Sequence, residues 1–294
     1  MKFSLWPNAG RRPSEILDAA RQVDDAGWYG VWVADHYMPN TGDESRAAGE
    51  IHEAWALLPA IAAVTERVRV GTLVSPTSVH HPAVLANRAA TLDHLSGGRM
   101  VLGLGAGWQV NEHAAYGIDL EPPGARVTRF EEAIRIVRSL LTEDRTTFAG
   151  KVYAISDAPC DPKPVQEQLP ILVGTSSPRM LRITARHAQE WNTWGTPEVA
   201  AERRAGLVAA CEKVGRDVAT MHSSVNALID LDGETPATGR AILTGSAEQL
   251  VDRMGAYAEA GFDEFILPDG NLGDTAAERS DRVARIKAEV IDRL

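Results

Sequence analysis

The chain has 294 residues, 44% of them hydrophobic, and a formal net charge of −10 at pH 7. This length and apolar content allow one large α/β domain or two smaller ones. The acidic balance argues against a nucleic acid or an anionic membrane surface as a partner.

The cysteines and the apolar runs indicate the compartment. Cys160 and Cys211 are far apart and lack zinc-ligand or disulfide-framework spacing, which suits a reducing environment. The apolar run at the start of the chain is too short for a signal peptide, and no stretch is long enough to span a bilayer. We therefore expect a cytoplasmic protein with no membrane contact.

Apolar runs typical of buried strands alternate with segments of helical spacing along the whole chain. A continuous apolar run predicts a strand that is buried on both faces of a parallel sheet. Strands are expected over residues 3–6, 30–36, 68–74, 99–104, 171–173, 190–194, 221–229 and 265–267. The first helix is expected to begin after Ser14, its N-cap, and to end at Gly27. Further helices are expected over residues 55–64, 82–95, 127–141, 178–187, 197–214 and 246–260, and at the end of the chain.

Eight β–α units of this length favour a closed (β/α)8 barrel, the TIM barrel, over an open sheet. The barrel forms a single domain over residues 1–294, with an insertion hairpin around 146–170 and a turn at Gly150 and Lys151. A doubly wound open sheet is the alternative. However, no strand is followed by a GxGxxG dinucleotide fingerprint.

Polar residues and glycines follow several predicted strands at the end where parallel α/β folds carry their chemistry. Asp35 and His36 end the second strand, although a loop cap and a surface histidine would explain them as well. Glycines at 105 and 107, before Trp108, would let the backbone approach a ligand closely, or they form a plain tight turn. A polar segment over 39–50 is expected to form a long loop over the strand ends.

Two small-residue loops precede predicted helices and offer backbone N–H groups to a phosphate. Their residues are Gly174, Thr175, Ser176 and Ser177 in the first loop, and Gly245 and Ser246 in the second. Ordinary helix capping would explain Ser246, because Gln249 completes a capping box. The pair of loops favours a phosphorylated ligand.

Two other kinds of enzyme are disfavoured. Histidines at 36, 80, 81 and 113 lie near predicted strand ends, but no HxH pair and no carboxylate set accompanies them, so we expect no metal site. A serine hydrolase would need a GxSxG nucleophile elbow, which does not occur.

An ordered set of short motifs carries a family resemblance. The motifs lie at residues 31–36, 71–76, 81–82, 96–99, 103–108, 162–166 and 261–263. Together they resemble the bacterial luciferase-like flavin and deazaflavin oxidoreductases, and most closely the actinobacterial branch that depends on coenzyme F420. The match runs over essentially the whole chain.

The resemblance implies a TIM barrel with a flavin-type cofactor at the carboxyl face. It implies that the two small-residue loops cradle the cofactor phosphate. It also implies a strained cis peptide near Leu73, Val74 and Ser75 behind the ring, which Asp35 and His36 would flank. Coenzyme F420 carries an acidic oligoglutamate tail, which is at odds with an acidic protein unless local arginines such as Arg179 and Arg182 compensate.

Residues beyond the glycines complete the expected site. Gly107 and Trp108 would contact the cofactor, and Asn111 and Glu112 would bond to the ring edge or to substrate, although a solvated helix start would explain both. An imidazole exchanges protons near neutral pH, so His36 is the expected proton carrier, with one ring nitrogen held by Asp35. Glu112 is the second catalytic candidate.

The sequence therefore predicts an oxidoreductase that transfers a hydride between coenzyme F420 and a small organic substrate, acting as a homodimer. An FMN-dependent luciferase-like monooxygenase is the alternative within the same class. A barrel that binds a phosphorylated ligand or a cofactor without redox turnover is the alternative from another class.

Overall fold

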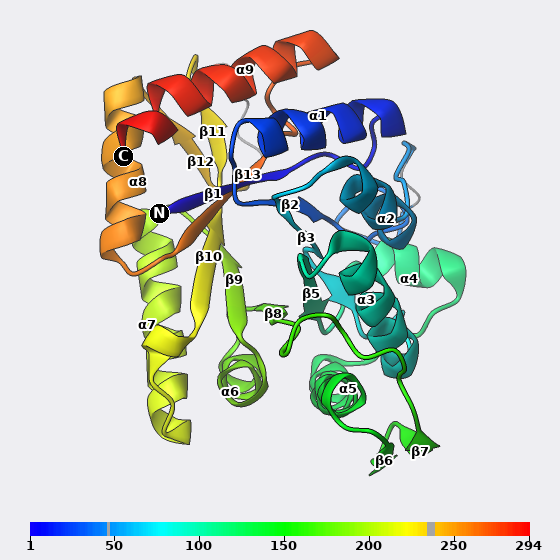
Figure 1. Ribbon diagram of the computed structural model, residues 1–294. Coiled ribbons are helices and arrows are strands. Elements are labelled where there is room, and N and C mark those ends of the chain that lie inside the picture. The colour runs from blue at the N-terminus through cyan, green and yellow to red at the C-terminus, as the bar shows by residue number, and fades with distance from the viewer. Residues whose placement is uncertain (46–47, 234–238) are drawn as a thin grey trace.

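Eight parallel strands close into a barrel with helices around it in the computed structural model, which describes residues 1–45, 48–233 and 239–294 (Figure 1). The strands follow the order β3-β2-β1-β13-β10-β9-β8-β5, and a β3–β5 pairing closes the ring. The barrel strands are β1 (Lys2–Trp6), β2 (Gly30–Val33), β3 (Arg69–Thr72), β5 (Met100–Gly105), β8 (Ile171–Gly174), β9 (Glu190–Trp194), β10 (His222–Asn226) and β13 (Glu264–Pro268). The predicted (β/α)8 barrel is confirmed.

Helices and short strands fill the connections. The helices are α1 (Pro13–Asp25), α2 (Ala54–Val64), α3 (Pro82–Ser96), α4 (Val110–Tyr116), α5 (Pro123–Thr142), α6 (Pro178–His187), α7 (Pro197–Val214), α8 (Ala247–Glu259) and α9 (Ala276–Glu289). The short strands are β4 (Ser75–Pro76), β6 (Thr146–Ala149), β7 (Ala154–Ala158), β11 (Leu228–Asp230) and β12 (Ile242–Thr244). Strands β6 and β7 form the predicted antiparallel insertion hairpin.

Side chains alternate between two apolar cores along the barrel strands. The larger core lies between the strands and the surrounding helices. The smaller one fills the barrel with side chains from several strands, among them Trp32, Val101, Leu172 and Ile266. This packing leaves the carboxyl ends of the strands, with their loops, as the place for a site.

Three local expectations need correction. Ser14 is not the N-cap of the first helix: α1 begins at Pro13 with Arg12 as its N-cap, because proline is already suited to the first helical turn. The seventh strand is divided into β10 and β11. Residues 110–116 form helix α4, which is not among the expected helices, while part of the predicted 39–50 loop lies outside the described residues. Among the described helices, none has the length and apolar character needed to cross a membrane.

Candidate active site at the carboxyl face

The chain bends sharply where β3 ends. The peptide between Leu73 and Val74 is cis, as predicted for this segment. The Val74 side chain then lies between two glycines: a Cβ atom on Gly105 would stand 2.7 Å from Val74 Cγ2, and one on Gly174 would stand 3.3 Å from Val74 Cγ1. Gly105 therefore leaves room for Val74, which the sequence alone did not indicate.

Asp35 is completely buried beside this bend. Its Oδ2 accepts hydrogen bonds from Ser75 Oγ at 2.5 Å and from Trp55 Nε1 at 3.1 Å, and it lies 2.9 Å from His80 Nε2. Its other oxygen, Oδ1, has no partner among the described residues. Asp35 therefore does not hold His36, contrary to the expectation, because successive residues of an extended segment point in opposite directions.

The charge of Asp35 is stabilised by this network. Burial alone would raise the pKa of the carboxyl group, but the hydrogen bond and charge of His80, together with the Ser75 and Trp55 hydrogen bonds, hold that pKa below its usual range. The carboxylate thus anchors the segment that follows the cis peptide.

His36 is held by Glu112 instead. Its Nδ1 lies 2.9 Å from Glu112 Oε1, and Glu112 Oε2 accepts a hydrogen bond from the backbone N–H of Tyr37 at 3.0 Å. Glu112 is buried, whereas the His36 side chain keeps 22% of its exposure. The Trp108 ring meets the His36 ring edge to face at 5.4 Å between centroids, so both predicted catalytic residues and Trp108 come together.

Helix α4 carries Glu112 and fastens the loop after β2. Asn111 Nδ2 donates to Pro39 O and Gln109 Nε2 donates to Met38 O, both at 2.8 Å. Asn111 Oδ1 is buried without a partner among the described residues. Asn111 and Glu112 are thus buried residues rather than part of a solvated helix start.

His113 and Gly107 also support this loop, a role that the sequence did not indicate for either residue. The His113 ring bridges Gln109 O, at 2.7 Å from Nδ1, and Ser78 Oγ, at 2.8 Å from Nε2. Gly107 has a φ of 89°, and a Cβ atom there would stand 2.1 Å from Ser78 Oγ. The left-handed Gly117 after residues 110–116 was the available signal for this helix.

The two predicted phosphate loops differ in what they leave free. In the loop before α6, the Ser177 side chain makes no capping hydrogen bond, and Ser176 and Ser177 are exposed. In the loop before α8, Ser246 and Gln249 form the predicted capping box, with Ser246 N donating to Gln249 Oε1 at 2.9 Å. In the first loop the N–H groups of Thr175 and Ser177 already donate to Asn192 O and Thr175 Oγ1, so the Ser176 and Ser177 hydroxyl groups are what it leaves free for a phosphate among the described residues.

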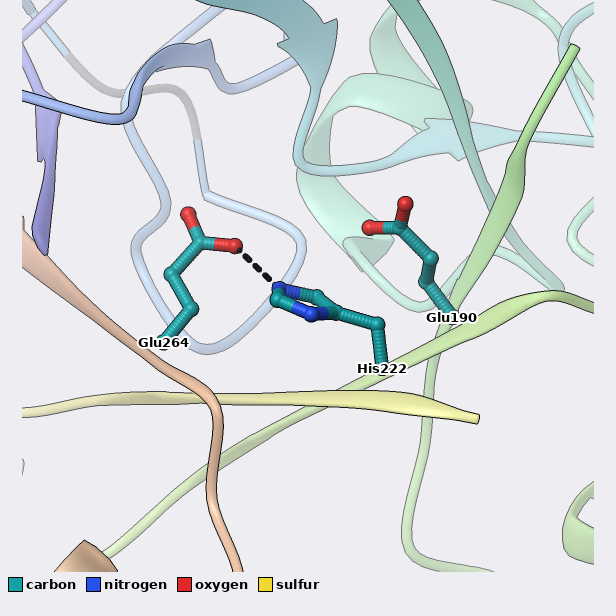
Figure 2. Close-up of side chains that lie close together, drawn as sticks. All are labelled: Glu190, His222 and Glu264. Atoms are coloured by element: carbon teal, nitrogen blue, oxygen red, sulfur yellow. Dashed lines mark hydrogen bonds and ion pairs between the residues drawn. The ribbon is translucent and has the colours of Figure 1, made fainter. Parts of the chain in front are cut away.

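A charged cluster lies at the opposite, amino end of the barrel. Figure 2 shows Glu190, His222 and Glu264, the first residues of β9, β10 and β13, with His222 bonded to Glu264. Their potential ligand atoms lie within 4.8 Å of one another. However, Arg69 pairs with Glu190, and Trp32 Nε1 donates to Glu264 at 2.8 Å, so groups of this chain already engage both carboxylates.

Comparison with known proteins assigns the class. The luciferase-like monooxygenase family model matches residues 1–232. An uncharacterised protein of Mycobacterium tuberculosis is 31% identical over 275 residues, which cover 88% of this chain and 89% of the relative. The chain belongs to the luciferase-like monooxygenase family.

Two further relatives name a cofactor. An F420-dependent glucose-6-phosphate dehydrogenase of Kineococcus radiotolerans is 35% identical over 175 residues, which cover 59% of this chain and 50% of the relative. The chain thus spans about half the length of such relatives. A solved F420-dependent secondary alcohol dehydrogenase in complex with an F420–acetone adduct has a TM-score of 0.84 at 19% identity and covers 99% of each chain, which supports the fold.

Proposed function

We propose that this protein is an oxidoreductase that transfers a hydride between coenzyme F420 and a small organic substrate. The observation that carries the proposal is the His36–Glu112 pair at the carboxyl face, where the neighbouring Asp35 accepts a hydrogen bond from Ser75. F420-dependent enzymes among the relatives support the choice of cofactor.

The residues at the carboxyl face fit a ring with polar edges. Asp35 Oδ1 and Asn111 Oδ1 are buried acceptors without a partner among the described residues, so N–H groups of a cofactor ring would satisfy them. Leu73, Val74 and Ser75 would back the ring, with Gly107 and Trp108 at its side. The loop of residues 174–177, together with Gly245 and Ser246, would hold the phosphate.

When bound, coenzyme F420 supplies a ring carbon that accepts a hydride from the substrate or returns one to it. Glu112 orients the His36 imidazole through Nδ1, which leaves Nε2 to face a substrate oxygen. Nε2 takes the proton of a hydroxyl group when the substrate is oxidised, and it gives a proton back when a carbonyl group is reduced. Trp108 shields the imidazole on one side.

Fluorescence titration with F420 and with FMN tests the proposal. We expect F420 to bind with saturation and FMN to bind weakly or not at all. Saturable binding of FMN without F420 binding would favour the FMN-dependent monooxygenase. Binding of F420 without anaerobic turnover of alcohols, enones or imines would favour the barrel that only binds a cofactor.

The proposal also includes a homodimer in the cytoplasm. Both cysteines are buried free thiols, which supports a reducing compartment. Size-exclusion chromatography with light scattering tests the dimer, and a monomeric mass would overturn it.

A further inference from the structure

A groove of about 630 Å³ lies between α6 and α7 on the outside of the barrel. It begins at Ser176, in the loop before α6, and it follows one face of α7 from Val199 to Lys213. Fourteen steps along the helix, at a rise of 1.5 Å each, give this face a length of about 21 Å. The groove is thus long enough for several residues of an extended chain.

The groove is basic although the protein is acidic. Arg182, Arg203 and Lys213 line it, and Glu202 is the one acidic residue among the described residues of its lining. Arg182 and Lys213 are exposed, and neither has a hydrogen-bond or ion-pair partner among the described residues. Three cations against one acid make the groove a local positive patch in a chain of net charge −10.

Small residues keep the groove open. Gly206, Ala209 and Ala210 lie along the α7 side, and a Cβ atom on Gly206 would already stand 3.3 Å from Leu181 Cδ1. Arg203 Nη1 donates a hydrogen bond to Trp194 O at the end of β9, which fixes its guanidinium group beside the groove. A chain with regularly spaced carboxylates can lie over this floor and reach the cations on both sides.

We infer that the α6–α7 groove binds the oligoglutamate tail of the cofactor, an inference that rests on the proposed function. The groove starts at the loop proposed for the cofactor phosphate, so the tail would run from Ser176 down along α7. Its carboxylates would meet Arg182 near the start and Lys213 at the far end. This arrangement explains how an acidic protein accepts an acidic cofactor.

The test compares the affinities of the protein for two forms of the cofactor: F420 with its full tail, and the same deazaflavin phosphate without glutamates. Both affinities are measured by fluorescence at low and at physiological salt. We expect the tailed form to bind more tightly, and we expect salt to reduce the difference because it screens exposed charges. Equal affinities for the two forms would show that the groove does not bind the tail, and they would leave the proposed function unchanged. Failure of both forms to bind would overturn both.

Charge-reversed variants locate the effect. In the double variant Arg182→Glu, Lys213→Glu we expect affinity for the tailed form to fall about two- to tenfold, the scale of two exposed ion pairs, with little change for the tailless form. Lys151→Glu reverses an exposed lysine on the insertion hairpin and should change neither affinity. A double variant that keeps the full advantage of the tail would contradict the inference.

Discussion

His36 and Glu112 are 76 residues apart in the sequence, yet His36 Nδ1 lies 2.9 Å from Glu112 Oε1. The histidine follows the second barrel strand, whereas the glutamate lies on a short helix after β5. The same carboxylate holds the N–H of Tyr37 with its other oxygen, so it fixes both the imidazole and the backbone next to it. A buried acid thus orients a partly exposed base at the mouth of the barrel.

Replacing His36 by alanine is expected to lower turnover by about 10²–10⁴, the usual contribution of general acid–base catalysis. Cofactor affinity should stay nearly unchanged, because the proposed phosphate loop lies elsewhere. His94→Ala, which removes an exposed histidine near the end of α3, serves as the control and should leave turnover unchanged. Turnover, cofactor affinity and Tm are measured on one preparation of each protein. Unimpaired turnover in His36→Ala would make Glu112 the next candidate for the proton carrier.

Asp35→Ala should lower the free energy of unfolding by about 3–5 kcal/mol, since it leaves the buried His80 and Ser75 without their shared acceptor. Asp18→Ala is the matched control: Asp18 is exposed and, within the described part of the chain, pairs with Arg21 alone, so a change within about 0.5 kcal/mol is expected. Denaturant unfolding measures both. Similar values for the two variants would show that the Asp35 network does not stabilise the fold.

Gly105→Ala should destabilise the protein by about 1–3 kcal/mol, because the added Cβ atom meets Val74 in a packed wall. Gly124→Ala adds the same atom in α5, where no heavy atom of another described part of the chain lies within 4 Å. There alanine should be neutral or stabilising by up to about 1 kcal/mol. Thermal unfolding compares the two variants, and an unchanged Tm in Gly105→Ala would contradict the packing described.

Acid should destabilise the fold through Glu264 as well as Asp35. Burial alone would raise the pKa of Glu264, but the hydrogen bond and charge of His222 hold that pKa below its usual value of 4.5. The unfolded chain therefore binds more protons, so this stability is present above pH 4.5 and is lost as the pH falls through the lower, folded value.

Glu264→Gln should flatten that acid limb of the stability curve and lower stability at neutral pH. The amide NH2 group would face either Trp32 Nε1 or His222 in place of an acceptor. Glu248→Gln changes an exposed glutamate on α8 and should leave the curve as it is. The free energy of unfolding is measured from about pH 3 to about pH 7 for all three proteins. Equal slopes against pH would show that Glu264 does not contribute to the acid sensitivity of the fold.

The sequence was sufficient for the barrel because strands that are buried on both faces read as continuous apolar runs between helical segments. The sequence also singled out His36 and Glu112 as candidate site residues. Their pairing was not predicted, because a contact between residues far apart depends on the barrel itself. The prediction that Asp35 holds His36 was wrong for a related reason. Neighbours in an extended segment point to opposite sides, so Asp35 faces Ser75 and His80 while His36 faces Glu112. The short α4 was missed because seven residues give little periodicity.

Anaerobic turnover tests the central claim most directly. Purified protein is incubated without oxygen with oxidised F420 and a panel of alcohols, and with reduced F420 and a panel of enones and imines, while cofactor absorbance and product are followed together. The account predicts that one direction proceeds without oxygen, with one cofactor converted for each product formed, and that His36→Ala slows it. Product that forms only with reduced FMN and molecular oxygen would contradict the account.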